Sequence, residues 1–282
     1  MYAGLKPSAG RIMTKFLDEF ISEFHNFVNS KVFHKYFFIH GGGLAVENAI
    51  KIAIDWKNFN NKKNKINIDP KKLEIISFKH GFHGVTGYTL NLSDNDVKVS
   101  GLPIIKWPKF EASVHNYDND SCSNVEKNLD IIEKYFDRKD KKNKIAAIII
   151  ETIQGGGGDR HICKDFLNGL ARILKKNKIL FIDDEVQTGF GVTGKLWSFQ
   201  KKYYNFTPDL LAFGKKSQIS GVCINKNLED IDDVINRPGR YPPTWNGDII
   251  DYVRCKYIIK AYKDDKLIKN AEKLGTYIVS SL

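Results

Sequence analysis

Three short runs of apolar residues in the middle of the chain constrain the fold most. They span residues 145–150, 179–182 and 210–213. Each run is continuous rather than alternating, which is typical of strands buried on both faces of a parallel sheet. Polar residues or glycine follow each run at once: Glu151, the acidic triplet 183–185, and Gly214 with Lys215 and Lys216. Because ligands of open parallel sheets bind beyond the carboxyl ends of the strands, we expect a functional site there.

The rest of the chain alternates between strand-like and helix-like segments. Further strands are expected at 35–39, 73–77 and 221–224, and helices at 11–28, 44–56, 124–136, 164–176 and 248–282, the last with a break near 264–265. Residues 57–72 and 237–243 are expected to be connections, and 93–123 show no regular pattern. Alternating strands and helices predict an α/β fold with a mostly parallel sheet.

The composition narrows the class of protein. With 42% hydrophobic and 27% charged residues in a chain of 282, an ordinary globular protein with an ample core is expected. No apolar run approaches the length of a membrane helix, and no signal-peptide pattern follows Met1. The net charge of +11 lies in Lys- and Asn-rich segments without interleaved aromatic residues, which disfavours nucleic-acid binding.

The spacing of the cysteines indicates the redox state of the compartment in which the protein is expected. Cys122, Cys163, Cys223 and Cys255 are widely scattered along the chain. Their spacing matches neither a disulfide framework nor a zinc site, and it fits a reducing cytosol. A cytoplasmic protein is therefore expected.

Two loops that follow predicted strands carry candidate binding residues. Gly41, Gly42 and Gly43 stand between a strand and a helix, where backbone amides can bind a phosphate. A flexible turn is the alternative, because short glycine motifs are common. Phe82 and His83 stand between two glycines, where an aromatic ring can stack on a flat cofactor. The alternative is a loop aromatic anchored in the core.

Asp184 and Lys215 are the candidate catalytic residues, because they follow neighbouring predicted strands. A carboxylate and an amine in these positions suit pyridoxal phosphate, because the amine forms a Schiff base and the carboxylate keeps the ring nitrogen protonated. Asp183 and Glu185 are better explained as helix-capping or surface acids. A metal site at the triplet is disfavoured, because no His or Cys lies near it in sequence. Spacing alone does not distinguish Lys215 from Lys216.

With these motifs in this order, the chain resembles the class III aminotransferases (ornithine/4-aminobutyrate type) over residues 6–282. The sharpest matches are 184–189 (DEVQTG) and 208–215 (PDLLAFGK). Within the class it is most similar to the L-lysine 6-aminotransferases. The segments that carry this similarity are 42–49, 82–84, 87–90, 157–161, 213–218 and 244–247.

The resemblance implies the aspartate aminotransferase fold, which is pyridoxal-phosphate fold type I. Residues 1–250 would form the cofactor-binding large domain, with helices on both faces of a mostly parallel sheet. Residues 251–282 would form a helix leading into a C-terminal small domain. That small domain and a further N-terminal segment of the family are expected to be absent from this chain.

The resemblance also implies a role for each site residue. Lys215 would form the internal aldimine, and Asp184 would pair with the ring nitrogen. The cofactor-binding residues would be Gly42, Gly43, Phe82, His83, Asp184, Val186, Gln187, Lys215 and Thr244. Glu151 and Gln187 would face the substrate. Thr244 would reach the phosphate held by the partner subunit, which implies a homodimer.

The implied reaction moves the ε-amino group of L-lysine to 2-oxoglutarate, giving 2-aminoadipate 6-semialdehyde and glutamate. The chain departs from the family pattern at two positions. Val85 stands where the family has an arginine that grips a substrate carboxylate, and Gly156 stands where it has a glutamate that helps to switch between the substrates. Two alternatives stay open: a truncated cofactor-binding remnant without transaminase activity, and an aminotransferase for another ω-amine, such as ornithine or 4-aminobutyrate.

Overall fold

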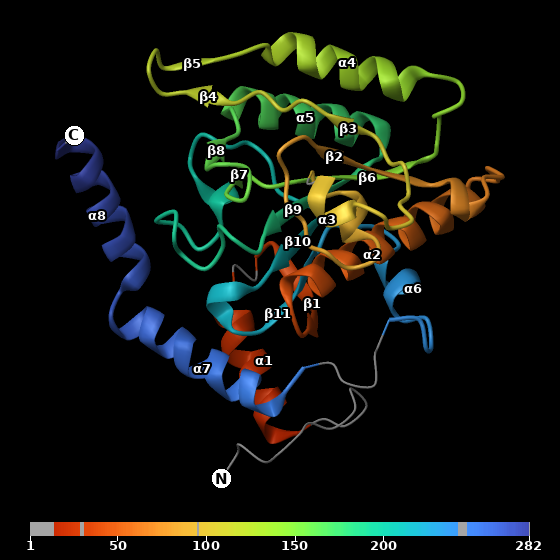
Figure 1. Ribbon diagram of the computed structural model, residues 1–282. Helices are drawn as coiled ribbons and strands as arrows, with labels where there is room; N and C mark the ends of the chain where they lie inside the picture. Colours follow the sequence, from red (N-terminus) through yellow and green to blue (C-terminus); the bar gives the residue numbers. More distant parts are fainter. Residues whose placement is uncertain (1–13, 29–30, 95, 242–246, 282) are drawn as a thin grey trace.

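A seven-stranded sheet forms the centre of the computed structural model, which describes residues 14–28, 31–94, 96–241 and 247–281 (Figure 1). The strand order is β1-β11-β10-β9-β6-β2-β3. Their bounds are β1 Phe33–Ile39, β2 Glu74–Phe78, β3 Lys109–Phe110, β6 Ile145–Ile150, β9 Leu180–Glu185, β10 Leu210–Phe213 and β11 Ser220–Asn225. Strands β10, β9, β6, β2 and β3 pair in parallel, and β11 is antiparallel to both of its neighbours. The predicted mostly parallel sheet is confirmed.

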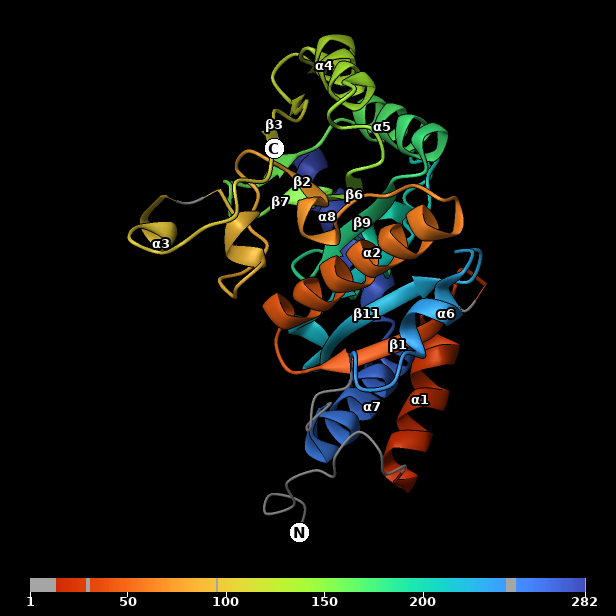
Figure 2. The same ribbon diagram turned by 90° about the vertical axis from the view of Figure 1, so that its right-hand side faces the viewer.

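Helices cover both faces of this sheet. On one face lie α2 (Gly42–Lys63) and α6 (Ile231–Ile235), and on the other lie α1 (Lys15–Phe27), α4 (Val125–Asp137), α5 (Lys164–Asn177) and α7 (Ile249–Asp264) (Figure 2). Successive strand residues alternate between the two layers: Ile75 packs on the α2 side and Ile76 on the other, and likewise Ile182 and Phe181. Because both faces are covered, both sets of side chains are apolar, which explains the unbroken apolar runs.

The helices differ from expectation in two places. Helix α2 continues to Lys63 rather than ending near residue 56. Its polar last turns are held by tertiary contacts, because Lys57 Nζ donates to the carbonyl of Lys178 and Asn61 Nδ2 to that of Asn143. The expected break near 264–265 is confirmed, since α8 (Leu267–Ser281) follows α7 there and runs away from the sheet (Figure 1). Within the described ranges, no helix is both long and apolar enough to cross a membrane.

Short elements that the sequence did not predict lie between the longer helices and strands, three of them in the stretch 93–123 that showed no regular pattern. They are η2 (Pro70–Lys72), η3 (Thr89–Asn91), α3 (Asp96–Val99), β4 (His115–Asn116), β5 (Ser121–Cys122), β7 (Ile153–Gln154), β8 (Arg160–His161), η4 (Ser198–Gln200) and η5 (Lys215–Ser217). Two small antiparallel ribbons result, one from β4 with β5 and one from β7 with β8. Elements of two to four residues are shorter than the window over which hydrophobic periodicity is read, so the sequence did not reveal them.

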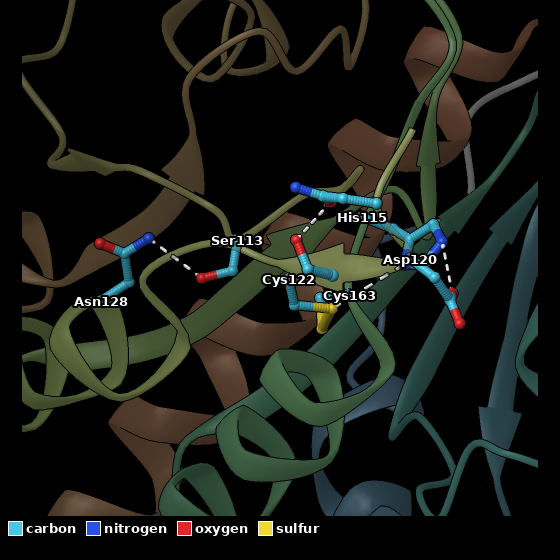
Figure 3. Close-up of a disulfide and its surroundings, with 8 residues drawn as sticks. Ser113, His115, Asp120, Cys122, Asn128 and Cys163 are labelled. Atoms are coloured by element: carbon cyan, nitrogen blue, oxygen red, sulfur yellow. Dashed lines mark hydrogen bonds and ion pairs between the residues drawn. A yellow bond between two sulfur atoms is a disulfide. The ribbon is translucent and has the colours of Figure 1, made fainter. Parts of the chain in front are cut away.

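A disulfide joins Cys122, in β5, to Cys163, the residue before α5 (Figure 3). The expectation that the cysteines form no disulfide is wrong for this pair, because 41 residues of sequence separate two positions that the fold brings together. Cys223 and Cys255 are free and buried. Disulfides persist mainly in oxidising compartments, so the cysteines no longer argue for a reducing cytosol.

Reduction of the Cys122–Cys163 disulfide should lower the free energy of unfolding by about 4 kcal/mol, because the bond closes a loop of about 40 residues and restricts the unfolded chain. Urea unfolding with and without a reductant measures this difference. A double variant, Cys122→Ser with Cys163→Ser, should have the lower stability in both conditions. A wild-type chain whose stability is the same in both conditions would contradict the bond.

Candidate functional site

A pocket of about 300 Å³ lies where β6, β9 and β10 end, beside the start of α2. Its lining residues are Gly42, Gly43, Val46, Phe82, His83, Gly84, Lys98, Glu151, Gly156, Asp184, Val186, Gln187 and Lys215. All the site residues predicted from the sequence are among them, except Thr244, which lies outside the described residues. The structure thus brings together residues from four strand ends and one helix start, and their roles stay predictions.

Four lining residues were not among the predicted site residues: Val46, Gly84, Lys98 and Gly156, the last named above only as a departure from the family pattern. Val46 could have been found from its position one turn after Gly42 in the same helix. Lys98 lies in the stretch without a regular pattern, so no sequence signal pointed to it. A larger groove of about 910 Å³ lies near the opposite ends of the strands, where Leu180 begins β9 and Asp209 precedes β10, and it holds none of the predicted site residues.

Side chains alternate between the two faces along β9, so the three acidic residues 183–185 do not all face the same side of the sheet. Asp184 points to the α2 face with Ile182, and it is 3% exposed. Its Oδ2 lies 2.8 Å from Nδ1 of His83, and its Oδ1 accepts the backbone N–H of Val186 at 3.1 Å. A buried carboxyl group needs such partners, because desolvation of a carboxylate is costly. Asp184 is therefore fixed in orientation at the floor of the pocket.

Asp183 and Glu185 point to the other face and are fully buried. Glu185 Oε1 accepts the backbone N–H groups of Ser198 and Phe199, at 2.5 and 3.3 Å, so it caps η4. The helix-cap interpretation is confirmed for Glu185, although the carboxyl group is not at the surface. For Asp183 it is wrong: neither oxygen has a hydrogen-bond partner in the described part of the chain. Burial, then Glu185 and Asp184, raise the pKa of Asp183 well above its usual range, which favours its neutral form.

The side chains of the two lysines after β10 make different contacts. The side chain of Lys215 lines the pocket, where its Nζ donates to Oε1 of Gln187. Nζ of Lys216 donates instead to the backbone carbonyl of Gln187, and Lys216 does not line the pocket. Lys215 has φ +53°, the left-handed region that non-glycine residues seldom occupy. Such strained backbone is concentrated at functional sites, because the surrounding structure must enforce it.

The glycines at the start of α2 leave their backbone open to the pocket. Gly41 provides no side-chain hydrogen bond to the first amides of this 22-residue helix. A Cβ on Gly42 would lie 2.5 Å from Cγ1 of Val186, too close for any larger residue. Helix N-termini carry unpaired N–H groups and a partial positive charge. The arrangement suits a phosphate, and the flexible-turn alternative does not fit a position that begins a long helix.

Phe82 and Glu151 form a second side of the pocket. Phe82 is 37% exposed, so it is not anchored in the core. Its backbone N–H donates to Oε1 of Glu151 at 2.8 Å. Burial raises the pKa of Glu151 to about 7, with His83 lowering it and Asp184 raising it further. A Cβ on Gly156 would lie 3.0 Å from Cβ of Phe82, so the glycine allows close packing here. Glu151 can therefore gain or lose a proton near neutral pH.

Comparison with known proteins shows which protein family this chain matches. Residues 11–282 match the family model for class III aminotransferases. The L-lysine-epsilon aminotransferases of Mycobacterium tuberculosis and Amycolatopsis lactamdurans are 31% and 32% identical over 98% of this chain and 62% of their own length. The 4-aminobutyrate aminotransferase of Schizosaccharomyces pombe is 32% identical over 75% of this chain and 44% of its own length. The chain thus spans less than two thirds of each of these relatives.

Solved structures agree with the fold. Lysine aminotransferase from M. tuberculosis in the internal aldimine form matches with a TM-score of 0.89 and 31% identity, over 98% of this chain and 63% of that one. The ornithine aminotransferase from Toxoplasma gondii matches with a TM-score of 0.76 and 24% identity, over 97% and 59%, and supports the fold alone. The predicted aspartate aminotransferase fold is confirmed.

Replacing the buried Asp183 by asparagine should stabilise the protein at high pH. A group whose native pKa is raised binds its proton more tightly in the folded state, so its contribution to stability is complete below its unfolded pKa and is lost as pH rises towards the native value. The wild type should therefore lose up to about 1.4 kcal/mol per pH unit over that window through this group.

Asp183→Asn should remove that loss, with stability near that of the wild type at pH 4 and above it at pH 8. Urea unfolding at both pH values measures the difference. The exposed Asp118→Asn should follow the wild type. Equal destabilisation of Asp183→Asn at both pH values would contradict a neutral buried carboxyl group.

Proposed function

This chain belongs to the class III aminotransferases, and we propose that it transfers the ε-amino group of L-lysine to 2-oxoglutarate with pyridoxal phosphate. Pyridoxal phosphate is the cofactor of this family. The observation that carries the proposal is the convergence of Asp184, Lys215 and the start of α2 on one pocket. The lysine substrate rests on the 31% identity to lysine aminotransferases, and the whole activity is proposed because the chain covers only 62% of their length.

The residues of the pocket fit the cofactor. Gly42 and Gly43 would hold the phosphate through the uncapped start of α2, where there is no room for a side chain at position 42. Asp184 would hold the ring nitrogen, and Val186 and Phe82 would supply apolar contact to the ring. Gln187 would bond the ring hydroxyl group, and Thr244 would reach the phosphate of a partner subunit. The homodimer, the domain boundary at residue 250 and a cytoplasmic location are parts of the same proposal.

The remaining residues would either transfer a proton or hold another side chain in its orientation. When bound, pyridoxal phosphate supplies a conjugated ring that takes up an electron pair from the substrate carbon. Lys215 Nζ would take the proton from that carbon as general base and deliver it to the cofactor as general acid, so that hydrolysis leaves the substrate carbon as a carbonyl carbon. His83 keeps Asp184 oriented through their 2.8 Å contact, and the charge of Asp184 holds a proton on the ring nitrogen. Glu151, with its pKa of about 7, contributes a proton-exchanging group on the substrate side.

Borohydride reduction of the chain with bound pyridoxal phosphate should attach the cofactor to Lys215 alone. Lys216 is expected to stay unmodified, because its amine turns away to the carbonyl of Gln187. Peptide mass spectrometry locates the label, and the visible spectrum follows cofactor binding. Lys215→Ala should lose both the label and the activity, and Lys216→Ala should keep the label. A folded wild-type chain without label at Lys215 would mean that the cofactor site has been lost, whereas label without turnover would favour the truncated cofactor-binding remnant.

A second substrate, 4-aminobutyrate, is favoured by the 32% identity to 4-aminobutyrate aminotransferase over 75% of this chain. Activity with lysine, ornithine and 4-aminobutyrate, each paired with 2-oxoglutarate, separates the candidates. We expect kcat/KM for lysine to exceed that for the other two by about tenfold or more, the scale that one well-placed polar contact provides. A preference for 4-aminobutyrate or ornithine would replace the lysine proposal without affecting the cofactor chemistry.

A further inference from the structure

The groove of about 910 Å³ lies at the amino-terminal ends of the central strands, away from the pocket that holds Asp184 and Lys215. We call it the far groove. The last turns of α2 and α5, the start of β9 and the segments 205–209 and 227–229 contribute to its walls. Its charged lining residues are Lys57, Arg172, Lys175, Lys178, Asp209 and Glu229. Cations therefore outnumber acids around it, four to two.

Lys57 is buried in this groove without a counter-ion. The residue is only 5% exposed, although its side chain ends in an amine. Its Nζ donates to the carbonyl of Lys178 at 3.2 Å, and no carboxylate of the described residues pairs with it. Burial, and then the charge of Lys178, lower the pKa of Lys57 to about 8. Since a buried charge without an opposite charge is costly, Lys57 indicates a place where an anion would be favoured.

Three further cations come from the end of α5. Arg172 and Lys175 are three residues apart and so lie on the same side of the helix, and Lys178 follows its last turn. All three are exposed, and within the described ranges none of them forms an ion pair. Lys176 provides the contrast: it does not line the groove, and its Nζ lies 2.7 Å from Glu133. The cations of α5 that face the groove are therefore the ones left without an acid.

Stabilisation of the end of α5 is the alternative role for these cations, because positive charges near a helix C-terminus offset its dipole. That role accounts for Lys175 and Lys178, which lie in or directly after the last turn. It does not account for the burial of Lys57, which belongs to α2 on the other face of the sheet. A single carbonyl occupies one of its three N–H donors.

We propose that the far groove is a second binding site, which takes small molecules that carry phosphate or pyrophosphate groups. Lys57 contacts the anion at the base of the groove, and Arg172 and Lys175 contact it from the rim. A phosphate group suits this set better than one carboxylate, because it carries up to two charges and three acceptor oxygens. Arginine also matches phosphate with two parallel donors. The site uses no residue of the proposed active site, so it goes beyond the aminotransferase function.

Titration calorimetry of the full chain with pyrophosphate tests the site. Lys57→Met should weaken binding about tenfold or more, because a charge-assisted hydrogen bond is lost. Pyrophosphate bound at the start of α2 would not respond to this change, since Lys57 lies 15 residues, or about 22 Å, along the helix from Gly42. A wild-type chain that does not bind pyrophosphate, or a Lys57→Met chain that binds it equally well, would overturn the proposal.

Exposed residues of α5 supply variants that do not depend on the packing of Lys57. The double variant Arg172→Gln with Lys175→Gln should also bind pyrophosphate about tenfold more weakly, with the urea unfolding curve of the wild type. The matched control is Lys176→Gln in the same turn, which removes a charge outside the groove. It should stay within about twofold of the wild type at about 0.15 M salt. Equal affinities of the double variant and this control would overturn the site, whatever Lys57→Met shows.

The pH dependence separates contact with the anion from a structural role of Lys57. Sulfate is the probe, because its charge stays constant from about pH 6 to about pH 9. Its affinity should fall as pH rises, since Lys57 loses its proton near pH 8 and Asp209, whose pKa burial raises to about 6, becomes charged. The other charged groups around the groove are Arg172, Lys175, Lys178 and Glu229. Above about pH 7 the fall should be much smaller in Lys57→Met, and an equal fall in both chains would overturn the contact.

Discussion

The burial of three consecutive carboxyl groups at the end of β9 is the constraint on which the site depends. Because side chains alternate along a strand, Asp184 must face α2 while Asp183 and Glu185 face the other layer. Each acid is accommodated differently: Asp184 by His83, Glu185 by the amides that it caps, and Asp183 by a raised pKa that favours its neutral form. A shift of one residue in the register would exchange these environments and remove the acid from the pocket. The register of β9 with its two parallel neighbours therefore determines which acid faces the pocket as well as how the sheet packs.

The pocket combines rigid and strained parts. Asp184 lies in β9 and Glu151 directly follows β6, and all residues of both strands are buried, so the positions of the two acids are determined by the sheet. Lys215 begins a 3₁₀ turn in the left-handed region, and this conformation must be maintained by its surroundings. The turn places two adjacent lysines on different groups of Gln187, one on the side chain and one on the backbone. One strained residue thus decides which amine faces the pocket, a distinction that two adjacent lysines in a sequence do not reveal.

The sequence predicted what depends on long-range periodicity and on strand ends. Continuous apolar runs placed β6 and β10 at their observed bounds and β9 to within three residues, and the polar residues after them indicated the site. It could not show that polar side chains such as Lys57 extend α2 through contacts with distant carbonyls. It also missed the pairing of Cys122 with Cys163, because closure of a 41-residue separation is a property of the folded chain. Asp183 was misjudged for a related reason: an acid beside a functional acid has no local signal of burial.

The residues that line the pocket come partly from the central sheet and partly from loops, and the two groups differ in how freely they can change. The groups proposed to act on protons, Lys215, Asp184 and Glu151, lie on central strands or within two residues of their ends, where a change of residue disturbs both packing layers. Lys98 lies instead on a four-residue helix, and its neighbour Val97 is 88% exposed, so residues there can change at little cost in stability. A side chain supplied from that short helix can therefore change while the residues on the central strands keep their positions.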